Sequence, residues 1–141
     1  MPALLAEEQR KGLGGLGYYQ SFAARVQELK AALVALIADL RRAGRKVAAY
    51  GASAKGSTLL NFYGLGPAQL DFVVDRSTYK QGRLTPGTHL PILPPDQLLA
   101  RRPDYTLLLT WNFADEILAQ QQAYRAAGGK FILPIPRVTV V

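Results

Sequence analysis

Short apolar runs alternate with helical repeats along most of this chain, and this alternation limits the fold more than any other feature. We expect strands over residues 46–50, 70–74, 89–92, 105–110 and 130–135, and helices over 57–63, 97–101 and 114–127. Strands that alternate with helices form a mostly parallel sheet covered on both faces. The sequence therefore predicts an α/β, Rossmann-like, doubly wound domain of about five strands in the order 3-2-1-4-5.

An extra helix precedes the first strand. Apolar residues recur at three- and four-residue steps from residue 18 to residue 40, and Gly44 supplies the stop. Three aromatic residues are expected to pack this helix on the sheet: Tyr18, Tyr19 and Phe22. Residues 1–17 are rich in glycine and are expected to be a flexible leader or the remnant of a linker. Residues 18–141 then form a single domain, because the chain is too short for two ordinary ones.

The composition excludes several classes of protein. Cysteine is absent, which excludes disulfides and thiolate metal sites, and the single His89 has no cluster of carboxylates around it. Hydrophobic residues make up 49% of the chain, which is too high for disorder. No apolar run approaches the roughly 18 to 20 residues of a membrane span. Charged residues at positions 7, 8, 10 and 11 exclude a signal peptide, so we expect a cytoplasmic protein.

The formal net charge of +7 favours an anionic partner, such as a nucleotide, a phosphate group or a nucleic acid. Part of this excess lies in the basic runs at residues 41–46 and 101–102, which are typical of ordinary solvated surface. The sequence has neither an aromatic–basic stripe nor a recognition helix. We therefore expect neither a nucleic acid nor a membrane as a partner.

The strongest local signal is the segment Gly51–Thr58, which follows the first strand and opens a helix. Glycine lets the backbone come close to a ligand, and a helix N-terminus offers free N–H groups to phosphate. Lys55 adds a full positive charge. The candidate contacts for a phosphate or diphosphate are Gly51, Ser53, Lys55, Gly56, Ser57 and Thr58. A structural alternative stays open here, in which the glycines only permit a tight turn and Ser57 is the helix N-cap.

The spacing in this segment is close to the dinucleotide-binding fingerprint, with Ser53 in the place of its middle glycine. Asp75 follows Gly51 by 24 residues, near the place where an acidic residue meets a ribose hydroxyl. A P-loop is excluded because Lys55 precedes Gly56, whereas that motif needs its lysine after the second glycine. The segment therefore predicts nucleotide binding without NTP hydrolysis.

Polar residues of other loops are expected at the same edge of the sheet. In the order 3-2-1-4-5 the loops after the first and fourth strands flank the ligand crevice, and the second strand ends beside them. The candidate residues there are Asp75, Arg76, Lys80, Trp111 and Asn112. A large aromatic at a strand end can stack on a flat ring or a sugar. Two alternatives stay open, with Trp111 as a cap on the core and Asp75 as a turn or helix-cap residue, while His89 is expected to be structural.

No group of residues in the sequence could run a reaction unaided. We find no Ser/His/Asp set, no carboxylate pair at an active-site spacing and no metal cluster. Asp115 and Glu116 open a helix, where the helix dipole alone favours acidic residues. We therefore expect no catalytic residue in this chain.

Six separate motifs follow one another in an order that one known family shares. They are Gly51–Thr58 with Asn61, Asp75–Ser77, Lys80–Gly82, Thr85–Thr88, Trp111–Asn112 and Gly128–Ile132. Together they resemble the C-terminal domain of S-adenosylmethionine-dependent sugar C-methyltransferases, which make branched deoxysugars. The resemblance covers roughly residues 18–141, and several motifs in one order are more specific than one glycine loop.

The resemblance implies a three-part enzyme that methylates a nucleotide-linked keto sugar through an enolate. Its N-terminal region binds zinc, its middle domain binds S-adenosylmethionine and holds the catalytic base, and its C-terminal part helps to enclose the substrate. The chain lacks the zinc cysteines and the donor motif, so it is expected to be inactive alone and to need those two domains as partners. The alternative is a stand-alone dinucleotide- or CoA-binding module with a regulatory role.

Overall fold

Six strands form one sheet in the computed structural model, which describes residues 2–141. The strand order is β3-β2-β1-β4-β5-β6, and each neighbouring pair is parallel except β5 and β6. The strands are β1 (Val47–Tyr50), β2 (Val73–Val74), β3 (Ile92–Leu93), β4 (Tyr105–Leu108), β5 (Lys130–Leu133) and β6 (Thr139–Val140). This topology confirms the predicted doubly wound order of the first five strands. The short antiparallel β6 was not predicted.

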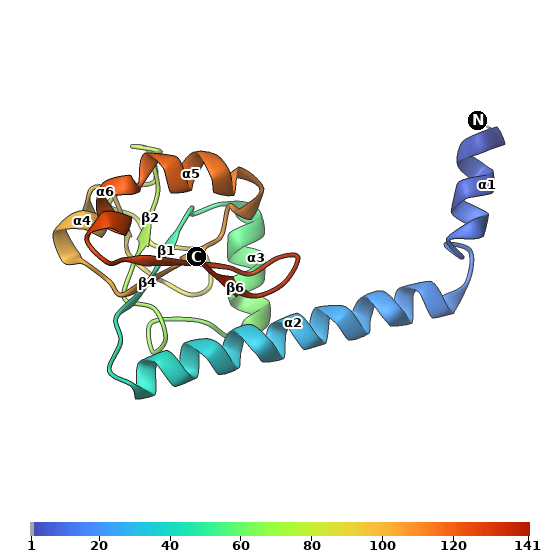
Figure 1. Ribbon diagram of the computed structural model, residues 1–141, viewed down its shortest axis with the longest axis horizontal. Coiled ribbons are helices and arrows are strands. Elements are labelled where there is room, and N and C mark those ends of the chain that lie inside the picture. Colours follow the sequence, from blue (N-terminus) through green and yellow to red (C-terminus); the bar gives the residue numbers. More distant parts are fainter. Residues whose placement is uncertain (1) are drawn as a thin grey trace.

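Helices cover both faces of the sheet (Figure 1). They are α1 (Pro2–Arg10), α2 (Leu16–Arg42), α3 (Ala54–Tyr63), α4 (Gln97–Arg101), α5 (Ala114–Gln120) and α6 (Gln122–Ala126), with the 3-10 helix η1 (Trp111–Phe113) before α5. The central strand β1 is buried along its whole length, as a parallel strand covered on both sides should be. Val47 and Ala49 pack toward α2 and α3, while Ala48 and Tyr50 pack toward α4, α5 and α6.

Tyr124 fixes α6 to the sheet from the second face. Its hydroxyl donates to the Pro103 carbonyl at 2.9 Å and accepts from the Thr106 hydroxyl at 2.9 Å. Burial raises the pKa of Tyr124 to about 12, which keeps the phenol neutral and able to donate. The ring lies against Gly129, where a Cβ atom would come within 2.1 Å of it.

Several predicted boundaries were wrong. The strand expected at 89–92 starts only at Ile92, because His89 adopts φ +56 in a turn in which its N–H bonds the Thr85 carbonyl. The second strand is limited to Val73–Val74, although the Asp71 N–H already bonds the Val47 carbonyl. The helix expected over 114–127 is divided at Gln121, whose backbone leaves the helical region.

The amino-terminal helices extend away from the sheet as an arm, which we define as residues 2–25 (Figure 1). The segment expected to be a leader contains α1, and α2 begins at Leu16. The prediction that Tyr18, Tyr19 and Phe22 pack on the sheet was wrong, since they are 39%, 53% and 57% exposed. At 1.5 Å per residue α2 is about 40 Å long, and only its second half reaches the sheet, through Leu33 and Ile37. Within residues 2–141 no helix is both long enough and apolar enough to cross a membrane.

Candidate functional site

The loop between β1 and α3 turns sharply at Gly51, which has φ +96. The Ser53 side chain caps α3 and accepts a hydrogen bond from the Gly56 N–H at 3.1 Å. The prediction that Gly51 follows the first strand is confirmed. The helix begins at Ala54 and not near Gly56, and the open alternative with Ser57 as N-cap was wrong, because Ser53 holds that position.

The first turn of α3 leaves two backbone donors available. Of the four N–H groups that a helix start leaves without a helical partner, that of Ser53 bonds the Gly51 carbonyl and that of Gly56 bonds the Ser53 hydroxyl. The N–H groups of Ala54 and Lys55 have no acceptor among residues 2–141. These two donors and the positive end of a ten-residue helix are suited to an anion.

The two glycines of the loop are also required by packing. A Cβ atom on Gly51 would lie 2.5 Å from Cγ2 of Thr110, and one on Gly56 would lie 2.8 Å from Cβ of Leu109. The loop therefore sits directly against the end of β4. This explains both glycines without a ligand, so the case for a site depends on the polar groups around them.

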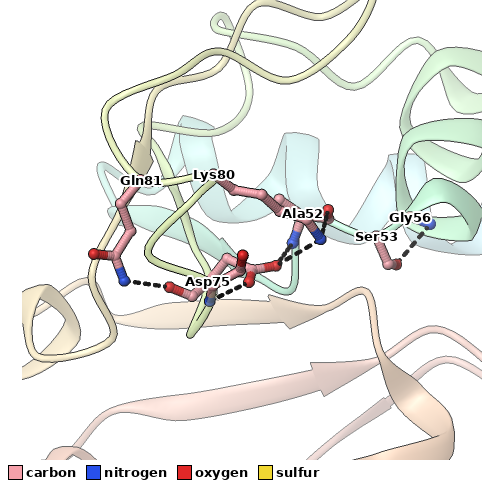
Figure 2. A network of polar contacts seen from close by, with 7 residues as sticks. Ala52, Ser53, Gly56, Asp75, Lys80 and Gln81 are labelled. Carbon is pink, nitrogen blue, oxygen red and sulfur yellow. Dashed lines mark hydrogen bonds and ion pairs between the residues drawn. The ribbon is translucent and has the colours of Figure 1, made fainter.

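Asp75 and Lys80 hold the loop from the side of β2 (Figure 2). The Asp75 carboxylate accepts the N–H of Ala52 at 2.7 Å and that of Ser77 at 2.8 Å. The Lys80 ammonium donates to the Ala52 carbonyl at 2.8 Å and lies 3.6 Å from the carboxylate. The Gln81 amide in turn donates to the Asp75 carbonyl at 2.9 Å. Both carboxylate oxygens of Asp75 are thus engaged by the backbone.

Lys55 connects the loop to the residues that follow β4. Its ammonium lies 4.3 Å from the centroid of the Trp111 ring and contacts Oδ1 of Asn112. Trp111 is half-buried and packs against the core cluster under α2 and α3, which agrees with the alternative that it caps the core. Ser57 and Thr58 lie within α3, where the Thr58 hydroxyl bonds the Ala54 carbonyl. The structure therefore brings Lys55, Trp111 and Asn112 together at the carboxyl edge of the sheet.

A cavity of about 250 Å³ lies beside this loop, and we call it the Tyr50 cavity. It is lined by Tyr50, Gly51, Asp75, Arg76, Thr110, Phe113, Glu116 and Ile117. Arg76 pairs with Glu116 across it at 3.1 Å. Sequence reasoning missed Tyr50, Thr110 and Phe113. The available signal was a tyrosine at the end of a central strand that is otherwise aliphatic.

A larger cavity, of about 640 Å³, lies at the opposite edge of the sheet. It contains Arg41 and Arg45, which pair with Asp71 at 3.1 Å and with Asp104 at 3.3 Å. Two of the four basic residues that line this cavity are therefore paired with protein carboxylates, whereas Lys46 and Arg101 have no such pair within residues 2–141. In the described part of the chain no three residues of His, Cys, Asp or Glu gather in a way that could hold a metal ion.

Comparison with known proteins adds an independent finding. Residues 1–136 match the family described as the C-methyltransferase C-terminal domain. The chain is also similar to the C-methyltransferase NovU from Streptomyces niveus, with 40% identity over 138 residues. That similarity covers 98% of this chain and 33% of the relative, so the chain spans about a third of the relative's length.

Proposed function

Because the chain belongs to the family of C-methyltransferase C-terminal domains, we propose that it binds the nucleotide-linked keto deoxysugar on which such an enzyme acts. The observation that carries this proposal is the start of α3. There, two free N–H groups, the helix dipole and the Lys55 ammonium meet at one edge of the sheet. Only a ligand with strong negative charge would use all three.

The diphosphate is the part of the substrate that this arrangement suits. The N–H groups of Ala54 and Lys55 and the Lys55 ammonium contact phosphate oxygens, and the Ser57 hydroxyl lies one turn further along. Trp111 acts through Lys55 in this proposal, because its ring lies under the ammonium that contacts the phosphates. Asp75 and Lys80 act indirectly in this proposal, because they hold the loop backbone at Ala52.

The methyl donor is proposed to be S-adenosylmethionine, bound by a part of the parent enzyme outside this chain. We propose that this chain is not the part that binds it, because the carboxylate after β2, which meets the ribose in dinucleotide-binding sheets, here accepts two backbone N–H groups. We therefore assign no step of methyl transfer to this chain. The proposal includes the zinc-binding and donor-binding domains as partners and a cytoplasmic location, with which the absence of cysteine is consistent.

Substitution of Lys55 tests the proposal. Lys55→Ala removes a charge-assisted contact worth about 1.5–3 kcal/mol, so affinity for a nucleotide-diphosphate sugar should fall about ten- to a hundredfold. Calorimetric titration of the chain with UDP-glucose, dTDP-glucose, ADP-glucose and GDP-mannose measures this change. The free energy of unfolding should change little, by less than about 0.5 kcal/mol.

Lys30→Ala is the matched control. Lys30 also lies over an aromatic ring, that of Phe62 at 4.6 Å, but at the opposite end of α3. Its loss should leave affinity unchanged. Equal binding by the wild-type chain and Lys55→Ala would show that the loop is a structural turn, and failure of the wild-type chain to bind any of the four sugars would refute the proposal.

A further inference from the structure

The Tyr50 cavity contains two buried hydroxyl groups that have no partner. The oxygens of Tyr50 and Thr110 are enclosed and make no hydrogen bond within residues 2–141. Tyr50 is only 3% exposed. The Gln121 side chain is near enough to affect the phenol, yet its geometry completes no hydrogen bond. Buried polar groups are normally paired, so two unpaired groups in one cavity call for an explanation.

The fold itself does not need these hydroxyls. A phenylalanine at position 50 would fill the same space between β1 and α5 without leaving a polar atom unpaired. Burial also raises the pKa of the Tyr50 phenol, while the Arg76 guanidinium opposes that rise. The phenol therefore stays protonated at neutral pH and can both donate and accept.

The position of the cavity points to one part of a nucleotide. It shares Gly51 with the segment Gly51–Thr58, which we call the diphosphate loop. The cavity lies at the carboxyl ends of β1, β2 and β4, in the crevice where doubly wound sheets bind ligands. Its wall combines the apolar Phe113 and Ile117 with a few polar groups, which is the usual composition of a small-molecule site. At its mouth the Arg76–Glu116 pair places a donor beside an acceptor.

We propose that the Tyr50 cavity receives the nucleobase of the bound nucleotide. The ring edge of a base carries hydrogen-bond donors and acceptors. The Tyr50 and Thr110 hydroxyls bond to these groups, because a hydroxyl can either donate or accept a hydrogen bond. The Phe113 side chain, 55% exposed at the rim, supplies a face on which the base stacks. This inference rests on the proposed function, because the diphosphate loop places the base next to the cavity.

Binding of nucleotides and of inorganic pyrophosphate to the 141-residue chain tests the inference. UDP, dTDP, ADP and GDP are titrated alongside pyrophosphate, by calorimetry or protein-observed NMR. Tyr50→Phe and Thr110→Val should each weaken the preferred nucleoside diphosphate by about two- to tenfold, the effect of one neutral hydrogen bond, and should leave pyrophosphate binding unchanged. Lys55→Ala should weaken both kinds of ligand.

Tyr63→Phe is the matched control, because Tyr63 is buried on the other face of the sheet, outside the cavity. It should bind every probe as the wild-type chain does, and Tyr50→Phe should melt no lower than wild type. Unchanged nucleotide affinity in both Tyr50→Phe and Thr110→Val would overturn the inference. The inference would also be overturned if nucleoside diphosphates bound no better than pyrophosphate. In either case the proposal that the loop binds the diphosphate would remain valid. If none of the probes bound, the proposal that the loop between β1 and α3 binds the diphosphate would be refuted as well.

Discussion

At the scale of single residues, Gly51 has the largest influence on the geometry of the candidate site. Its backbone adopts φ +96, which residues with a side chain rarely adopt, and the Thr110 side chain occupies the space where a Cβ would be. Gly51 also belongs to both parts of the proposed site, since it begins the loop to α3 and lines the Tyr50 cavity. This one residue thus determines the turn after β1 and is shared by the loop and the cavity.

We predict that Gly51→Ala lowers the free energy of unfolding by at least about 2 kcal/mol, because strained backbone and a close contact add together. Urea denaturation measures the loss. Gly17→Ala is the control, since Gly17 lies in α2 and a Cβ atom there would have nothing within 4 Å. At that position alanine should stabilise by up to about 1 kcal/mol. Similar effects of the two substitutions would contradict this account of Gly51.

At the scale of elements, α2 has two halves with different roles. Its second half is part of the core through Leu33 and Ile37, whereas residues 14–25 are exposed throughout. The arm therefore contributes little to the stability of the sheet. The family match nevertheless includes it, since the matched residues begin at position 1.

Substitutions in the two halves should separate these roles. Leu33→Ala leaves a cavity beneath the sheet and should cost about 2–5 kcal/mol of unfolding free energy. Tyr19→Ala removes a side chain that is 53% exposed and should change stability by less than about 0.5 kcal/mol. Thermal and urea unfolding of both variants check this. A large loss in Tyr19→Ala would mean that the arm packs on the body of the domain.

At the scale of the whole molecule, the proposed function gives this chain a binding edge and assigns the groups that transfer the methyl group to other parts of the parent enzyme. We predict that the 141-residue chain transfers no methyl group from labelled S-adenosylmethionine to a nucleotide-linked keto sugar. The physical reason is that methyl transfer needs a donor site and a free base, which the proposal places outside this chain, and that the Asp75 carboxylate at the candidate site already accepts two backbone N–H groups. A full-length C-methyltransferase is the positive control, and turnover by the chain alone would refute the prediction.

The sequence by itself determined the order of elements from α2 to β5, the strand order of the first five strands and the edge at which polar loops gather. These features follow from local periodicity and from the glycines at positions 51 and 56, which act over a few residues. The structural alternative drawn from the same local signals put the α3 cap at Ser57 instead of Ser53, because a cap depends on which backbone N–H the side chain actually reaches.

Only the tertiary structure decided what these residues contact. Asp75 has the spacing of a ribose ligand, yet its carboxylate is engaged by Ala52, a neighbour that the fold alone brings close. The apolar stripe of α2 predicted contact along the whole helix, but the sheet is too short to cover it, so Tyr19 and Phe22 stay exposed. The Tyr50 cavity arises where β1, β2 and β4 end together, and no sequence pattern reports the space between side chains that are distant along the chain.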